Sequence, residues 1–282
     1  MSLIAPHGII DSHLHIWELG VSKYEWIKPE LGFLYNDFPI TEARFELSAA
    51  GVGNAILVQV EDSSADTEYM LSVAESSDWI LGVIGWINLE APEILESKLK
   101  EEYSNSSIVG FRHLIHDDPR EGFLEFPSVR KSLQIIASSD FAFDIPDAWP
   151  RSIGHIAGLA ASTPELRIVI DHLGKPPGNP EAYGYWLQEF EKTSRYPNVY
   201  TKLSGLLEYS ETYTAATIRS LFDETLSLFG TDRIMFGGDW PVSSNNGHYS
   251  DSVQVLFELI STLSASEQDS ILSQNARAIY KL

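Results

Sequence analysis

Cysteine is absent from the 282-residue sequence. This excludes disulfide bonds, thiolate catalysis and cysteine-bound zinc, so any metal ion must be held by histidine, aspartate or glutamate. Long apolar runs are absent too, because no segment approaches the roughly 20 residues needed to cross a bilayer. The segment Met1–Pro6 has neither the basic region nor the long apolar region of a secretory signal. We therefore expect a soluble, cytoplasmic protein without a membrane partner.

Positive charge is scarce. The chain has 19 lysines and arginines against 40 aspartates and glutamates, which gives a formal net charge of −21. The resulting negative field repels phosphate backbones, so we expect no nucleic-acid partner. The acidic residues are spread along the chain without a long block, which is typical of a solubilising surface. A small-molecule substrate is the expected partner, and the sequence predicts no particular oligomeric state.

Apolar residues make up 44% of the chain and charged residues 21%, a composition typical of a globular protein. Short segments rich in β-branched and aromatic residues alternate with longer amphipathic ones, which indicates strands alternating with helices. The expected strands are Gly8–Trp17, Ala55–Val60, Ile80–Ile87, Ile108–Arg112, Phe141–Ile145, Arg167–Asp171, Val199–Leu203 and Arg233–Gly237. The expected helices between them are Thr41–Ala50, Asp66–Ser77, Pro92–Tyr103, Ser128–Ser138, Ile153–Ala161, Tyr183–Ser194, Ala215–Phe229 and Ser250–Ser261. This pattern predicts an α/β fold, a single (β/α)₈ TIM-barrel domain over residues 1–282 with a parallel sheet.

Two further segments accompany this pattern. Glu18–Pro39 is long, irregular and rich in aromatic residues, and two interpretations have equal weight: a lid over the active site, or a hydrophobic cluster that merely covers the barrel end. Ser264 and Glu267 match a capping box, which predicts that a last helix, Ala265–Tyr280, begins there. We expect this helix on the barrel exterior.

Polar residues end three of the apolar strands. His13 and His15 close the first strand, where residues two apart point to the same side. His172 follows the sixth strand and Asp239 the eighth, each beside glycine and proline. Because functional groups of parallel barrels project from the carboxyl ends of strands, these side chains are expected to meet in one site. A histidine pair alone is weak evidence, since core hydrogen bonds also satisfy buried histidines.

Five motifs extend this pattern over nearly the whole chain: Ile10–Trp17, Gly110–His113, Asp171–Pro176, Lys202–Gly205 and Met235–Pro241. In this order they resemble the amidohydrolase-2 branch of the amidohydrolase superfamily. Within that branch the chain is similar to the L-fuconolactonase, L-rhamnonolactonase and 2-pyrone-4,6-dicarboxylate lactonase group. The motifs do not fix the substrate.

The resemblance implies a hydrolase that opens a sugar-derived lactone to its hydroxy acid, with His13, His15, His172 and Asp239 as the catalytic cluster. Asp239 would be the general base, and the histidines would activate the carbonyl. The same four residues would be the ligands if a metal is bound. The resemblance is compatible with one divalent ion, of which zinc is the first candidate, and with hydrolysis without a metal. Binuclear relatives carry a carboxylated lysine or a glutamate after strand 4 and a histidine after strand 5, which this chain lacks, so we expect no two-metal site.

The expected substrate-binding residues are Arg112, His113, Trp17, Lys202 and Trp240. Arg112 could clamp a carboxylate or hold sugar hydroxyls, or could instead pair with a barrel carboxylate such as Asp144. Ordinary barrel packing is an equal alternative for the tryptophans, and charge neutralisation is a similar alternative for Lys202. The remaining histidines, His7, His116, His155 and His248, are expected to be ordinary surface or loop residues.

Two other functions stay open. Arg112 motivates a metal-dependent decarboxylase acting on an aromatic or related carboxylic acid, although the related decarboxylases use a strand-5 histidine that is missing here. A barrel without catalysis that serves in binding is the third alternative, and the intact cluster argues against it.

Overall fold

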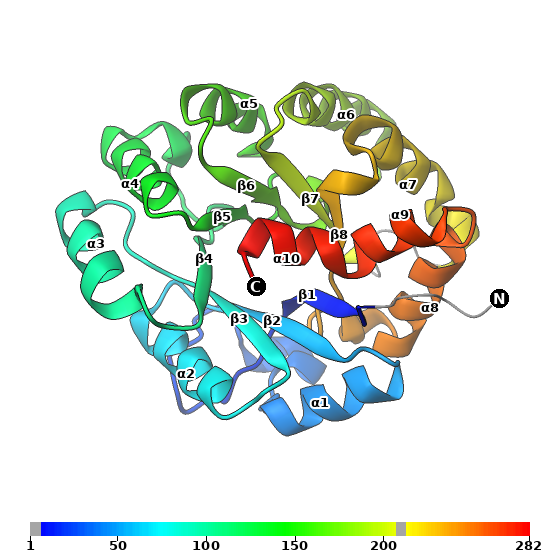
Figure 1. Ribbon diagram of the computed structural model, residues 1–282, viewed down its shortest axis with the longest axis horizontal. Coiled ribbons are helices and arrows are strands. Elements are labelled where there is room, and N and C mark those ends of the chain that lie inside the picture. The colour runs from blue at the N-terminus through cyan, green and yellow to red at the C-terminus, as the bar shows by residue number, and fades with distance from the viewer. Residues whose placement is uncertain (1–6, 207–212) are drawn as a thin grey trace.

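The computed structural model describes residues 7–206 and 213–282, apart from the side chain of residue 246, and forms a ring of parallel strands surrounded by helices (Figure 1). The strands are β1 (Ile10–Leu14), β2 (Asn54–Val58), β3 (Ile80–Gly85), β4 (Ile108–Arg112), β5 (Ala142–Ile145), β6 (Arg167–Ile170), β7 (Val199–Leu203) and β8 (Ile234–Phe236). They pair in sequence order. The ring closes where Leu14 bridges Trp240 in parallel and the Asp239 amide donates to the His13 carbonyl at 2.8 Å. The predicted (β/α)₈ barrel is confirmed.

Helices follow the strands in turn. They are α1 (Ile40–Ala49), α2 (Ser64–Glu75), α3 (Pro92–Lys98), α4 (Pro127–Ser138), α5 (Ile153–Ser162), α6 (Pro180–Ser194), α7 (Ala215–Phe229), α8 (Tyr249–Ile260), α9 (Ala265–Asp269) and α10 (Asn275–Tyr280). Among the described residues, none of these helices is long and apolar enough to cross a membrane.

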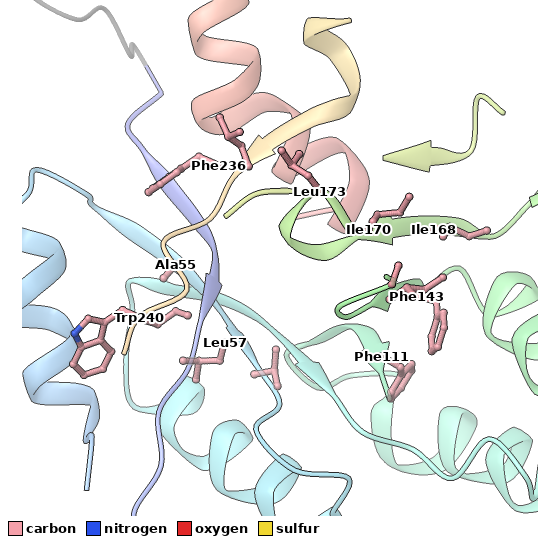
Figure 2. Close-up of a cluster of buried hydrophobic side chains, with 14 of the residues drawn as sticks. Ala55, Leu57, Phe111, Phe143, Ile168, Ile170, Leu173, Phe236 and Trp240 are labelled. Atoms are coloured by element: carbon pink, nitrogen blue, oxygen red, sulfur yellow. The ribbon is translucent and has the colours of Figure 1, made fainter. Parts of the chain in front are cut away.

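The apolar residues of the strands divide into two layers, because successive side chains of a strand point to opposite faces. In β2, Leu57 belongs to the large core between the barrel and its helices, whereas Ile56 and Val58 belong to a smaller cluster inside the barrel. Figure 2 shows part of the larger core, with Phe111 and Phe143 beside one another on β4 and β5. Burial on both faces explains why these strands are continuously apolar.

The last helical segment lies across the amino-terminal end of the barrel rather than on its exterior, which corrects the expectation from the sequence (Figure 1). A π-helical turn, Ser270–Gln274, joins α9 to α10. Ile279 and Tyr280 pack with Ile56 and Val58 in the inner cluster. The predicted capping box is present, since the Ser264 side chain accepts the amide of residue 267. Amphipathic periodicity predicted this helix but carried no information on which surface it covers.

Several element bounds differ from those predicted. β1 ends at Leu14, so His15 lies just beyond the strand. β6 ends at Ile170, and a 3-10 turn begins at Asp171. α6 begins at Pro180, because the Asn179 side chain accepts two amides of its first turn.

The segment from Glu18 to Pro39 forms the hydrophobic cluster that was one of its two interpretations. Trp17 and Phe38 form an isolated antiparallel bridge, and their buried rings pack edge to face, which makes a satellite cluster. Trp26 lines the cavity described below, so the segment also forms part of its wall.

Candidate active site

A layer of charged residues lies in the barrel above the inner apolar cluster. Arg112, Asp144 and Lys202 come from the carboxyl-terminal halves of β4, β5 and β7, and Asp171 follows β6. All four side chains are buried. Lys202 Nζ lies 2.6 Å from Asp144 and 3.1 Å from Asp171, and Arg112 Nη1 donates to Asp171 at 3.0 Å. Charges this deeply buried are tolerated because each is paired.

His13, His15 and Asp239 converge next to this layer. The Nε2 atoms of the two histidines lie 3.1 Å apart, and Asp239 Oδ1 lies 3.7 Å from that of His13 and 3.4 Å from that of His15. His172 Nε2 lies 3.9 Å from the same oxygen. Ser243 donates to the other Asp239 oxygen at 2.8 Å, so the carboxylate is held in a fixed orientation. The structure therefore brings together all four residues predicted to form the cluster.

Backbone geometry at the strand ends positions two of these groups. His172 and Asp239 have left-handed φ angles of 53° and 55°. Such angles are uncommon outside glycine and concentrate at functional sites. His172 Nδ1 lies 2.8 Å from Ser204 Oγ, and Gly205 approaches the ring so closely that an added Cβ would lie 2.6 Å from Nδ1.

The environment of Asp239 keeps its carboxylate ionised. Burial alone raises the pKa of Asp239, but the neighbouring His172, His15 and His13 outweigh it and hold the pKa well below its usual range. Burial lowers the pKa of His13 and of His15, so both imidazoles are neutral at pH 7. The site thus presents one carboxylate base beside neutral imidazoles.

The tautomer of His13 determines what the cluster can hold. His15 Nδ1 lies 2.8 Å from the Val58 carbonyl, which only accepts, so His15 Nε2 presents a lone pair. If His13 carries its proton on Nε2, it donates to His15, and Lys202 donates to His13 Nδ1 at 3.2 Å. If the proton is on Nδ1, it donates to Asp171 at 3.3 Å, and the Nε2 lone pairs of both histidines converge with the carboxylate of Asp239. In that form Arg112 Nη1, 3.2 Å away, donates to His13 Nε2 while no metal is bound.

The second arrangement fits one divalent metal ion. Ligand atoms roughly 2.1 Å from a tetrahedral zinc ion are separated from one another by roughly 3.4 Å. The three separations among His13, His15 and Asp239 are 3.1, 3.4 and 3.7 Å. These residues would leave one position for water or a carbonyl oxygen. The first arrangement pairs the two imidazoles with each other and requires no metal.

A cavity of about 440 Å³ opens onto this cluster. His15, Arg112, His172 and Asp239 line its inner end. The rest of the lining consists of Trp26, Val60, Leu114, His116, Asp117, Pro146, Asp147, Lys175, Pro176, Gly205, Leu206 and Val242. This volume lies in the usual range for small-molecule sites.

Several residues predicted to bind substrate do not line this cavity. Trp17 is fully buried and donates to the Asn36 carbonyl, and Trp240 packs against Phe38. Lys202 is fully buried beneath His13. For these three residues the predicted substrate contact does not hold in this structure.

The two residues that close β4 lie in different places. Arg112 lines the cavity, and its carboxylate partner is Asp171 rather than Asp144. His113 stacks on Phe123 and lines a neighbouring cavity of about 940 Å³. His113 therefore lines a different cavity from the one that holds Asp239, although its position in the sequence predicted that it binds the same substrate.

Sequence reasoning missed four polar residues of the cavity: His116, Asp117, Asp147 and Lys175. They lie in the loops after β4, β5 and β6. His116 was expected to be an ordinary loop residue. Their position in the loops that follow the carboxyl ends of the strands could have identified these four residues, because barrel active sites are built from these loops.

Comparison with known proteins places the chain in a family. The amidohydrolase family model matches residues 10–282. The L-fucono-1,5-lactonase of Burkholderia ambifaria is 30% identical over 86% of this chain and 83% of its own length. The L-fucono-1,5-lactonase of Burkholderia multivorans is 28% identical over 97% and 96%. A crystal structure of an amidohydrolase from Burkholderia multivorans with bound zinc is 26% identical, with a TM-score of 0.88 over 97% of this chain and 99% of that one.

A closed (β/α)₈ barrel with histidines and a carboxylate at the carboxyl ends of its strands has the usual architecture of a barrel enzyme's active site. The chain belongs to the amidohydrolase family, and this membership together with the lactonase relatives supports a hydrolase.

Proposed function

We propose that the protein hydrolyses a sugar-derived lactone, of the L-fucono- or L-rhamnono-lactone type, to its hydroxy acid. The observation that carries the proposal is the position of the ionised Asp239 in the cavity wall, within 4 Å of both His15 and His172. The relatives that act on L-fuconolactone support the sugar-lactone class.

The reaction needs one base and one group that stabilises negative charge. Asp239 accepts a proton from water while the water oxygen bonds to the lactone carbonyl carbon. The tetrahedral oxyanion collapses, the ring C–O bond breaks, and the proton held by Asp239 passes to the ring oxygen, which becomes a hydroxyl. One water is consumed, and Asp239 returns to its ionised state.

His172 lies beside Asp239 at the inner end of the cavity, where its Nε2 can donate to the carbonyl oxygen as negative charge develops, while its Nδ1 accepts from Ser204. His15 presents a lone pair at Nε2, so it would activate the carbonyl only through a bound metal ion. Arg112 and Lys202 are positioning residues in this scheme, because they hold Asp171 and His13 from behind. In the metal-bound form, His13, His15 and Asp239 would hold one divalent ion, with zinc proposed first. Such an ion supplies Lewis-acid polarisation of the carbonyl when bound.

The decarboxylase alternative loses the observation that motivated it. Of the alternatives for Arg112, a clamp on a substrate carboxylate favoured the decarboxylase, but its guanidinium already contacts the barrel carboxylate Asp171 and the Gln59 carbonyl. Lactone hydrolysis needs no free cation in the cavity, so the geometry favours it.

A pH-indicator assay of purified protein against a panel of aldono-lactones, with and without a chelator, tests the proposal. We expect acid release from at least one sugar lactone. Replacing Asp239→Asn should lower kcat at least 100-fold, because the general base is lost while the side-chain volume is kept. Glu165→Gln, an exposed change in the loop before β6 at the opposite end of the barrel, is the control and should keep the wild-type rate.

Either of two results would contradict the proposal. Full activity in Asp239→Asn would exclude Asp239 as the base. Carbon dioxide release from an aromatic acid by a protein that hydrolyses no lactone would support the decarboxylase instead. Loss of lactone hydrolysis on chelation, restored by zinc, would establish the metal-bound form.

A further inference from the structure

The outer part of the cavity has a polar wall that the proposed reaction does not use. His116 and Asp117 come from the loop after β4, Asp147 from the loop after β5 and Lys175 from the loop after β6. Asp147 has a left-handed φ of 38°, a conformation uncommon for residues other than glycine. The three loops thus present hydrogen-bonding groups to whatever molecule fills the cavity.

The charged residues of the cavity lining are unfavourable for an anion. Among the described residues the lining has three carboxylates, Asp117, Asp147 and Asp239, and two permanent cations, Arg112 and Lys175. Each cation is already paired, since Arg112 contacts Asp171 at 3.0 Å and Lys175 contacts Asp147 at 2.8 Å. A ligand carboxylate would therefore meet more negative than positive charge and would compete for cations that are already neutralised.

The same wall suits hydroxyl groups. The pKa of Asp147 is raised by burial but lowered more by His172 and Lys175, so the carboxylate is ionised and accepts hydrogen bonds. Burial lowers the pKa of His116, so its imidazole is neutral and offers one donor and one acceptor. The buried His116 Nδ1 has no hydrogen-bond partner among the described residues. These groups match a ligand whose polar atoms are hydroxyls.

The remaining lining is apolar. Trp26, Leu114, Pro146, Pro176 and Val242 surround the cavity between its polar groups. Such surfaces pack against the C–H faces of a sugar ring, whereas they provide no hydrogen bond or positive charge for a carboxylate on the ligand.

We propose that His116, Asp117 and Asp147 form a specificity wall that binds the hydroxyls of an uncharged lactone and disfavours carboxylated lactones. This proposal rests on the proposed lactonase function and names the substrate class of that site. Lys175 holds Asp147 in place within the wall.

The wall also distinguishes substrate from product. Hydrolysis converts a neutral lactone into a hydroxy acid that is an anion at pH 7. This new carboxylate would lie in a cavity whose described lining already includes Asp117, Asp147 and Asp239. We therefore expect the hydroxy acid to be a weak inhibitor, with an inhibition constant at least tenfold above the KM of the lactone.

The turnover test compares two lactones that differ at one group: L-galactono-1,5-lactone and galactaro-1,5-lactone, in which a carboxylate replaces the C6 hydroxymethyl group. Wild-type protein should show a kcat/KM at least tenfold higher for the neutral lactone. Asp147→Asn, which tolerates the left-handed backbone, should raise the KM for the neutral lactone with kcat within about twofold, and should reduce the discrimination. Asp117→Asn should reduce it as well, and Glu165→Gln should leave it unchanged.

Binding of the corresponding 1,5-lactams, which resist hydrolysis, tests the wall independently of catalysis. Calorimetry should give a Kd at least tenfold lower for the neutral lactam than for the carboxylated one. Equal binding of the two lactams, or equal turnover of the two lactones, would overturn the specificity wall and leave the lactonase proposal intact. Tight binding of the neutral lactam by a protein that hydrolyses no lactone would support the wall and overturn the proposed function.

Discussion

Tyr280 offers a direct test of how the last helix supports the barrel interior. Its hydroxyl lies 2.9 and 3.0 Å from the two oxygens of Asp144, which in turn contacts Lys202 at 2.6 Å. All three side chains are fully or almost fully buried. Tyr280→Phe removes one donor from a buried carboxylate and leaves the ring in place.

A hydrogen bond to a charged group contributes about 1.5–3 kcal/mol, so Tyr280→Phe should reduce the free energy of unfolding by about 2 kcal/mol. For a protein of this size, that corresponds to a decrease in Tm of roughly 3–4 °C. Urea unfolding followed by circular dichroism and by tryptophan fluorescence measures the change. Tyr185→Phe is the control, because the Tyr185 side chain is exposed and should be replaceable without loss.

Equal urea midpoints for wild type and Tyr280→Phe would refute this reasoning. That result would mean that the Asp144 carboxylate gains nothing from the hydroxyl, and that α10 is held by its apolar contacts alone.

Three further predictions concern the buried charges and the site. Lys202→Met leaves two buried aspartates without their shared cation, and should cost about 3–5 kcal/mol of unfolding free energy in urea titration; an unchanged midpoint would contradict it. Gly205→Ala places a Cβ 2.6 Å from His172 Nδ1 at a φ of +65°. Lactonase activity should therefore fall at least tenfold, while the circular dichroism spectrum is retained. Gly184→Ala is the control and should be fully active, because a Cβ added there meets nothing within 4 Å. Burial raises the pKa of Asp66 to about 6, so between pH 3.8 and about 6 the folded state keeps a proton that the unfolded state releases. The contribution of Asp66 to the free energy of unfolding is therefore lost as the pH rises through this range. The stability of wild type relative to Asp66→Asn should therefore fall by up to about 3 kcal/mol between pH 4 and pH 7 in urea unfolding, and a pH-independent difference would refute the shift.

Much of this fold could be predicted from local pattern. The alternation of apolar strands with amphipathic helices predicted every strand of the barrel, because strands buried on both faces must be apolar along their length. Bounds were less accurate where a side-chain cap decides them. Asn179, for example, starts α6 earlier than its apolar periodicity indicates.

The chemical cluster was also predictable from the sequence. His13 lies near the end of β1, whereas His15, His172 and Asp239 follow apolar strands, and parallel strands of a barrel present their carboxyl ends to one site. Residue type and position along the chain therefore determined which groups meet.

Only the tertiary structure decided which neighbours each group has. Arg112 pairs with Asp171 and Tyr280 reaches Asp144, across 59 and 136 residues of sequence respectively. Trp17 is removed from the cavity and Asp147 is brought into it by loop conformations that no periodicity encodes. The sequence by itself determined the barrel and its reactive cluster, since both follow from local periodicity and strand ends. The lining of the cavity depends on contacts between loops distant in sequence, so only the folded chain defines it.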